Sequence, residues 1–220
     1  MKRPALAMST LILASLACQL PGLGSSSPRV IFKDDFSNED SGWPTINETA
    51  GTANYKDGGY ELTVPDPDSG YWATPELEDQ TNTSIEVDAT VTGSARDSDF
   101  GILCRGIDSD NQIFLLISAD GYAVIGKFKD GEFSTLSSEE WVESSAINQG
   151  SQLNHIRGDC VDNTFALYVN GTQVATATDD DFPSGMVGLT IGSYQDPKGA
   201  VLFDNFVVTE NKTAVDDTTP

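Results

Sequence analysis

Polar and apolar residues alternate with a period of two along much of this chain. The alternation is clearest in residues 60–64, 84–92, 153–161 and 164–169. Because successive side chains of a β-strand point to opposite faces of its sheet, this period predicts strands with one buried face and one exposed face. More continuously apolar runs predict further strands at residues 111–119 and 122–128, and residues 186–193 and 200–209 are the last two strands of the series.

Short turn signals separate these segments. Asp-Gly or Asn-Gly pairs stand at positions 57–58, 120–121, 130–131 and 170–171. Such pairs favour the tight turns of β-hairpins, because they adopt left-handed backbone conformations readily. Only residues 137–145 are compatible with a turn of helix, and a loop is the alternative there. About a dozen short strands joined by tight turns predict an all-β fold, an antiparallel two-sheet sandwich.

The chain is strongly acidic, with 12 basic and 34 acidic residues and a formal net charge of −22. A surface of this charge repels phosphate backbones and anionic headgroups, so we exclude nucleic acid as a partner. Residues 29–210 suffice for one sizeable core and leave no room for a second domain. We expect a monomer with a flexible tether at residues 18–28 and a polar tail at residues 211–220.

The first seventeen residues have the features of an export signal. Lys2 and Arg3 precede an apolar run over residues 5–17, which is too short to span a bilayer and ends before Cys18. Residues 15–18, Ser-Leu-Ala-Cys, resemble the lipobox of bacterial lipoproteins, although Ser15 stands where that motif prefers Leu. We therefore expect acylation of Cys18 and an extracytoplasmic, lipid-anchored domain that contacts the membrane only through this lipid. Cleavage after Ala17 without acylation, which would give a secreted protein, remains the alternative.

The number of cysteines also agrees with export. Removing Cys18 to a lipid leaves the pair Cys104 and Cys160, 56 positions apart. An oxidising compartment favours a disulfide between them, and two buried free thiols are the alternative. Neither cysteine belongs to a Cys-x-x-Cys or Cys/His cluster, so the sequence gives no support to zinc binding or thiol redox chemistry.

Several short segments together resemble the concanavalin A-like lectin/glucanase superfamily. They are Phe-Lys-Asp-Asp-Phe-Ser at 32–37, Ser-Gly-Trp at 41–43, and residues 99–105, 154–157, 168–171 and 202–206. Within the superfamily, the chain is most similar to laminin G-like domains often described as 3-keto-disaccharide hydrolases or as domains of unknown function, many on exported bacterial proteins. The resemblance covers residues 30–209 and implies a two-sheet jelly roll with a concave face that commonly meets carbohydrate. Its motifs consist of turn and core residues, so they specify the fold rather than the chemistry.

The sequence assigns no catalytic residues. The segment with Glu86 and Asp88 resembles the Glu-x-Asp-x-Glu strand of laminarinase-type glucanases, but Thr90 replaces the final Glu. Retaining glycosidases need a second carboxyl group about 5 Å from the first, and this strand does not supply one. We interpret it as an ordinary strand whose intervening apolar residues are buried. His155, the single histidine, is expected to be a hydrogen-bonded surface residue, and no serine lies in a nucleophile elbow.

Aromatic residues are the better candidates for function, because a sugar ring can stack its apolar face on them. Trp72, Tyr122 and Trp141 lie near predicted strand edges or polar loops, whereas Trp43 is expected in the core. Arg105 alternates out of phase with Cys104 and should face away from its side of the sheet. We predict a ligand-binding surface from Trp72, Arg105, Tyr122 and Trp141, with a surface ion pair as the alternative role for Arg105.

The resemblance also implies a structural calcium ion. In related jelly-roll carbohydrate-binding modules a cation is often held by acidic residues of the first and last strands. Asp34, Asp35 and Asp204 occupy positions of this kind, with backbone carbonyls and water completing the shell. Carboxylates that cap turns or face solvent are the alternative.

These observations predict an exported, lipid-anchored β-sandwich that binds a glycan without catalysis. Two alternatives stay open, a glycoside hydrolase whose carboxylates the fold brings together and a structural or adhesion module. A converging acidic pair in a concave cleft would favour the hydrolase. A surface without an aromatic-lined groove would favour the structural module.

Overall fold

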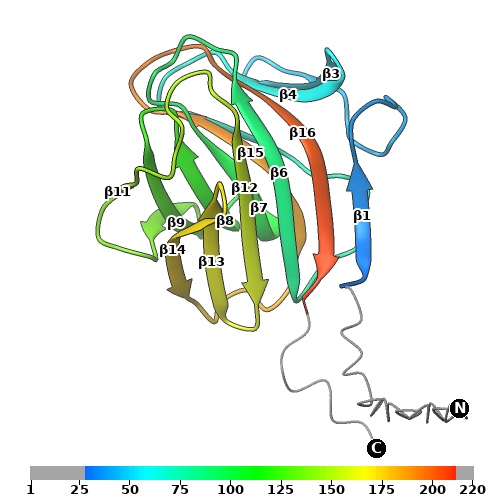
Figure 1. The fold of residues 1–220 in the computed structure, drawn as a ribbon, viewed down its shortest axis with the longest axis vertical. Coiled ribbons are helices and arrows are strands. Elements are labelled where there is room, and N and C mark those ends of the chain that lie inside the picture. Colours follow the sequence, from blue (N-terminus) through cyan, green and yellow to red (C-terminus); the bar gives the residue numbers. More distant parts are fainter. Residues whose placement is uncertain (1–27, 212–220) are drawn as a thin grey trace, which may run out of the picture.

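Two antiparallel β-sheets packed face to face make up residues 28–211, the part of the chain that the computed structural model describes (Figure 1). The predicted all-β sandwich is confirmed. These residues form no helix, and so none that is long and apolar enough to cross a membrane.

One sheet has nine strands. Their bounds are β1 (Val30–Asp34), β2 (Ile46–Asn47), β3 (Thr52–Lys56), β4 (Gly59–Val64), β6 (Thr83–Val91), β12 (Asn154–Val161), β13 (Thr164–Val169), β14 (Thr172–Thr178) and β16 (Gly199–Glu210). The order is β14-β13-β12-β6-β16-β4-β3-β2, with β1 paired to β16.

The other sheet has seven strands. They are β5 (Ser69–Ala73), β7 (Asp99–Asp108), β8 (Asn111–Ser118), β9 (Tyr122–Lys129), β10 (Glu132–Thr135), β11 (Val142–Glu143) and β15 (Met186–Ser193). The order is β10-β9-β8-β7-β15-β5, with β11 paired to β9. Residues 137–145 form a loop that contains β11 rather than a turn of helix.

Three of the four Asp-Gly and Asn-Gly pairs form the expected turns. Both residues have positive φ at 57–58 (52° and 81°), 130–131 (53° and 79°) and 170–171 (49° and 82°), as a type I′ hairpin turn requires. The pair at 120–121 differs, because only Gly121 has positive φ, at 102°. The turn between β8 and β9 is therefore not of type I′. The role of its Asp120 carboxylate is described with the pocket below.

The core lies between the two sheets. Alternate residues of each strand point into it, as with Ile85, Val87 and Ala89 of β6, all 1% exposed or less. Trp43 is 5% exposed and contacts aromatic rings of the first and last strands, Phe32 and Phe206, which confirms its predicted core position. The predicted disulfide is also confirmed, since Cys104 of β7 is bonded to Cys160 of β12 and so joins the two sheets.

The outer face of the seven-stranded sheet carries a second, smaller apolar cluster. Its buried members are Leu103, Phe114, Leu116 and Val124. They are partly covered by the side chains of Trp72, Phe128, Trp141 and Met186. This sheet therefore has apolar side chains on both faces, unlike a sheet with one solvated polar face.

The sandwich has two distinct ends. At one end, which we call the terminal end, Val30 of β1 pairs with Thr209 of β16, and Glu210 pairs with Thr83 of β6. At the other, the distal end, Val201 pairs with Val91. The β6–β7, β8–β9 and β15–β16 connections all lie at the distal end, because Asp99 at the start of β7 pairs with Ser118 at the end of β8 and with Gly192 near the end of β15.

Candidate ligand-binding site

Four paired residues, two of them glycines, form a row across the seven-stranded sheet at its distal end. Gly70 of β5 pairs with Gly192 of β15, Gly192 pairs with Asp99 of β7, and Asp99 pairs with Ser118 of β8. A Cβ atom on Gly192 would lie 2.1 Å from Oδ1 of Asp99, so only glycine leaves room for this carboxylate. Because two of these residues are glycines, no large side chain fills the outer face of the sheet at this position.

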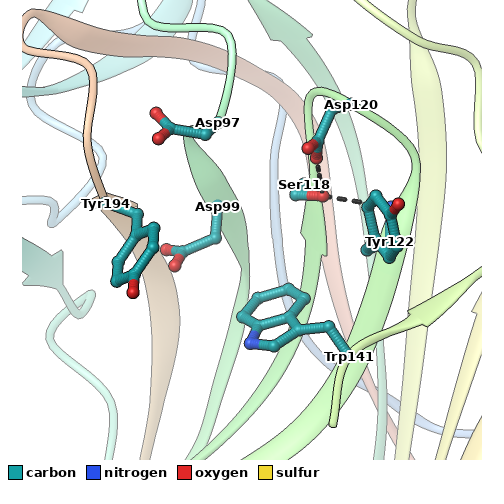
Figure 2. A pocket seen from close by; sticks show the side chains of 7 residues that line it. All are labelled: Asp97, Asp99, Ser118, Asp120, Tyr122, Trp141 and Tyr194. Atoms are coloured by element: carbon teal, nitrogen blue, oxygen red, sulfur yellow. Dashed lines mark hydrogen bonds between the residues drawn. The ribbon is translucent and has the colours of Figure 1, made fainter.

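Loops at the distal end surround this row of residues, and together they form a pocket of about 450 Å³. Its lining consists of Asp97, Asp99, Ser118, Asp120, Tyr122, Trp141 and Tyr194 (Figure 2). Trp141 belongs to the segment that enters β11, where Val142 pairs with Ala123 of β9. Tyr194 follows β15 and is 62% exposed. In Figure 2 the carboxylate of Asp99 points toward the ring of Tyr194, and the ring of Trp141 lies on the other side of Asp99.

Backbone hydrogen bonds hold the loops that carry these side chains. The Asp97 carboxylate accepts the N–H groups of Gln195 (2.7 Å) and Asp196 (3.2 Å), which ties the β6–β7 loop to the loop that carries Tyr194. The Tyr194 carbonyl accepts the N–H of Asp68 at 2.9 Å. These contacts hold the backbone of the loop that carries Tyr194 beside the pocket.

The corner between β8 and β9 supplies a second set of contacts. The hydroxyl of Ser118 donates to the Asp120 carboxylate, and its oxygen accepts the Tyr122 N–H at 3.0 Å. Ser118 therefore holds the Asp120 carboxylate and the backbone of Tyr122 on the side of the pocket opposite Tyr194 (Figure 2).

Asp99 has the most perturbed carboxyl group of the pocket. Burial, together with the nearby charge of Asp97, raises the pKa of Asp99 to about 7, although the hydrogen bond from the backbone N–H of Gly192 acts in the opposite direction. Near neutral pH this carboxyl group therefore exists in both protonation states. It can donate a hydrogen bond to a ligand oxygen or accept one from a ligand hydroxyl.

Two of the four residues predicted to bind ligand meet in this pocket. Tyr122 and Trp141 both line it. Trp72 lies on the same face of the sheet but packs on the smaller apolar cluster and is not part of the lining.

Arg105 is the fourth predicted residue, and the structure corrects its orientation. The pairing of β7 with β8 shifts register between Cys104 and Asp108, and Arg105 has φ of 55°. Such a bulge re-aims a side chain, so the alternation counted from Cys104 fails at this residue. Arg105 is 1% exposed, with its guanidinium 5.1 Å from the centroid of the Phe165 ring.

The contacts of Arg105 are structural. Its guanidinium donates to the carbonyl oxygens of Thr81 (3.1 Å), Phe182 (3.1 Å) and Asp162, which belong to three different connections. Arg105 follows Asp99 by six residues on β7, a distance of about 20 Å along an extended strand. It lies toward the terminal end and lines a separate hollow there.

The three aspartates proposed for calcium lie in local hydrogen bonds. Asp34 and Asp35 each accept the backbone N–H two residues further on (2.8 and 3.2 Å), and Asp204 accepts that of the next residue (2.7 Å). Within residues 28–211, no group of three or more His, Cys, Asp or Glu side chains is arranged to hold a metal ion. The structure therefore does not gather these carboxylates into the expected site, and calcium binding stays a prediction.

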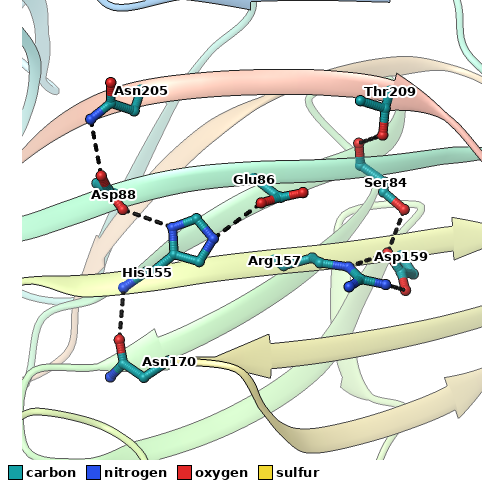
Figure 3. Close-up of polar contacts among 9 residues, drawn as sticks. All are labelled: Ser84, Glu86, Asp88, His155, Arg157, Asp159, Asn170, Asn205 and Thr209. Carbon is teal, nitrogen blue, oxygen red and sulfur yellow. Dashed lines mark hydrogen bonds and ion pairs between the residues drawn. The ribbon is translucent and has the colours of Figure 1, made fainter. Parts of the chain in front are cut away.

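The strand that resembles a glucanase strand faces away from the pocket. Glu86 and Asp88 lie on the outer face of the nine-stranded sheet, on either side of His155 (Figure 3). The His155 ring nitrogens lie 2.7 Å from Asp88 Oδ1 and 3.2 Å from Glu86 Oε2. Both predictions for this region are confirmed: His155 is a hydrogen-bonded surface residue, and the apolar residues between the carboxylates are buried.

Comparison with known proteins supports the fold. No protein-family model matches the chain, and no curated protein is similar to it in sequence. Among solved structures, the carbohydrate-binding module CBM66 from Bacillus subtilis superposes with a TM-score of 0.62 at 18% identity, over 77% of this chain and 96% of that one. The chain has a concanavalin A-like jelly-roll fold.

Two further structures share this jelly-roll fold. The β-glucanase of Bacillus licheniformis gives a TM-score of 0.60 at 14% identity, over 85% of this chain and all of the enzyme. A Bacillus subtilis protein of unknown function with a galectin-like fold gives 0.57 at 10% identity, over 84% and 97% of the two chains. At these identities the likeness establishes the fold alone.

Proposed function

We propose that this chain is an exported, lipid-anchored carbohydrate-binding module that holds a glycan in the distal pocket without catalysis. The observation that carries the proposal is the lining of that pocket, in which the rings of Tyr122, Trp141 and Tyr194 surround hydrogen-bonding carboxylates. Aromatic rings accept the apolar face of a sugar, and carboxylates accept its hydroxyl protons. The fold shared with a carbohydrate-binding module supports the same conclusion.

A glycan array with the purified domain, followed by titration calorimetry, tests this function. We expect dissociation constants from micromolar to millimolar, because stacking must offset the displacement of water from the sugar hydroxyls. Trp141→Ala and Tyr194→Ala should each weaken binding about tenfold, the equivalent of about 1.4 kcal/mol. Tyr168→Ala is the matched control, since it removes a ring from the outer face of the nine-stranded sheet. Equal losses in all three variants would contradict binding at the pocket.

A glycoside hydrolase is the second candidate, and Asp99 is the observation that favours it. A carboxyl group that is still partly protonated near neutral pH can act as a general acid, and Asp97 and Asp120 place further carboxylates in the same pocket. Release of reducing sugar by the purified domain, abolished by Asp99→Asn, would replace the binding proposal. Silence in both assays would leave a structural or adhesion module as the better account.

Lipid anchoring is proposed from the sequence alone, because Cys18 lies outside the described residues. Mass spectrometry of the native protein should find a mature N-terminus at Cys18 that carries diacylglycerol. An unmodified Cys18 would indicate a secreted protein instead.

A further inference from the structure

The pocket holds three carboxylates and no basic side chain in its lining. Asp97 is hydrogen-bonded to two backbone N–H groups, and Asp120 is hydrogen-bonded to the Ser118 hydroxyl. All of these donors are neutral. Within residues 28–211, every ion pair lies elsewhere and none includes Asp97, Asp99 or Asp120. The negative charge of the pocket is therefore left without a protein cation.

The lack of a cation partner matters most for Asp99, which lies at the base of the pocket. Its carboxylate lies over Gly192 and points into the hollow, and no side chain in the described residues donates a hydrogen bond to it. A carboxylate that is withdrawn from water and faces a second carboxylate gains most from a ligand that brings a positive charge.

The aromatic lining favours the same kind of ligand. The faces of Trp and Tyr rings attract cations as well as apolar sugar faces. Tyr194 is exposed enough to cover a ligand from one side, while Trp141 lies on the other side of Asp99. An anionic sugar would meet three carboxylates and a chain of net charge −22, so it is disfavoured.

We propose that the distal pocket recognises the protonated amino group of an unacetylated hexosamine, with Asp99 and Asp120 facing the ammonium and Trp141 and Tyr194 facing the ring. This inference rests on the proposed function and names its ligand class. An N-acetyl group in the same position would remove the charge, add bulk and leave the Asp99 carboxylate without a cation.

Calorimetry at pH 7, where Asp99 is partly ionised, with three oligosaccharides of equal length tests the inference. The probes are oligomers of glucosamine, N-acetylglucosamine and galacturonic acid. We expect the glucosamine oligomer to bind at least tenfold more tightly than the acetylated one, with an advantage that shrinks in high salt, and the galacturonate oligomer not to bind. Equal affinity for the first two would overturn the ligand class while leaving glycan binding intact. No binding to any glycan, here or on the array, would overturn both.

Two carboxylate variants separate the pocket from the general negative charge of the surface. Asp99→Asn and Asp120→Asn should each reduce the preference for the glucosamine oligomer about tenfold or more. Glu86→Gln removes the same charge from the outer face of the other sheet and should leave the preference unchanged. If Glu86→Gln reduces it as much as the pocket variants do, non-specific attraction to an acidic protein explains the binding and the proposal is wrong.

Discussion

Replacing Asp99 by Asn should stabilise the protein at alkaline pH and leave it unchanged at acidic pH. Burial and the charge of Asp97 raise the pKa of Asp99 from its ordinary value of 3.8 to about 7. Between these two values the folded protein holds a proton that the unfolded chain has released, so the free energy of unfolding falls as pH rises. Above about pH 7 the carboxylate is ionised in both states and its full unfavourable effect is present.

The size of the effect follows from the difference between the two pKa values. Each unit corresponds to about 1.4 kcal/mol, so the difference sets an upper bound of about 4 kcal/mol. Because Asp99 is partly accessible, water screens some of this, and we expect Asp99→Asn to raise the free energy of unfolding by about 2 to 4 kcal/mol at pH 8. Asparagine has nearly the same shape and carries no charge at either pH.

Urea unfolding of both proteins, followed by tryptophan fluorescence at pH 4, 6 and 8, measures the difference. Other titrating groups cancel when the variant is compared with the natural chain at the same pH. Asp120→Asn is the matched control, because it removes a carboxylate from an exposed position of the same pocket. A difference that does not grow with pH, or an equal gain from Asp120→Asn, would refute the argument from burial.

Three further predictions concern the stability of the domain. Removing the disulfide with the double variant Cys104→Ala, Cys160→Ala should lower the free energy of unfolding by about 4 kcal/mol, the value for a loop of 56 residues, as measured by urea unfolding under non-reducing conditions. Arg105→Lys should lower it by about 2 to 4 kcal/mol, since one ammonium cannot reach all three carbonyl groups, while glycan affinity by calorimetry stays constant. If calcium is bound as the sequence predicts, a chelator at constant ionic strength lowers the melting temperature, and an unchanged temperature contradicts it.

Local patterns predicted most of the fold. Alternation over a few residues is enough to identify a strand, and the segment 186–193 was predicted with the same bounds that β15 has. The pattern failed where an extra residue enters a strand, because a bulge changes the phase of every later position. Arg105 is the clearest example, since its side chain turns inward at a residue where counting from Cys104 placed it outward.

The site was predicted only in part, because its residues are distant in sequence. Tyr122 and Trp141 can be predicted from the sequence, because they are aromatic residues beside turns or polar loops. Asp97 and Tyr194 meet only because β15 pairs with β7, and that pairing cannot be deduced from one sequence. Gly192 is one of 20 glycines, and nothing in its neighbours marks it as the residue beneath a carboxylate.

The separation of the two ends of the sandwich determines how an anchored domain presents its pocket. Strand β1 begins and strand β16 ends at the terminal end (Figure 1), whereas Asp99 and Tyr194 lie at the distal end. An anchor attached before Val30 would thus be joined to the end of the domain that is opposite the pocket. If Cys18 is acylated as proposed, the pocket lies at the end of the domain farther from the point of attachment, where polymers in the surroundings can reach it.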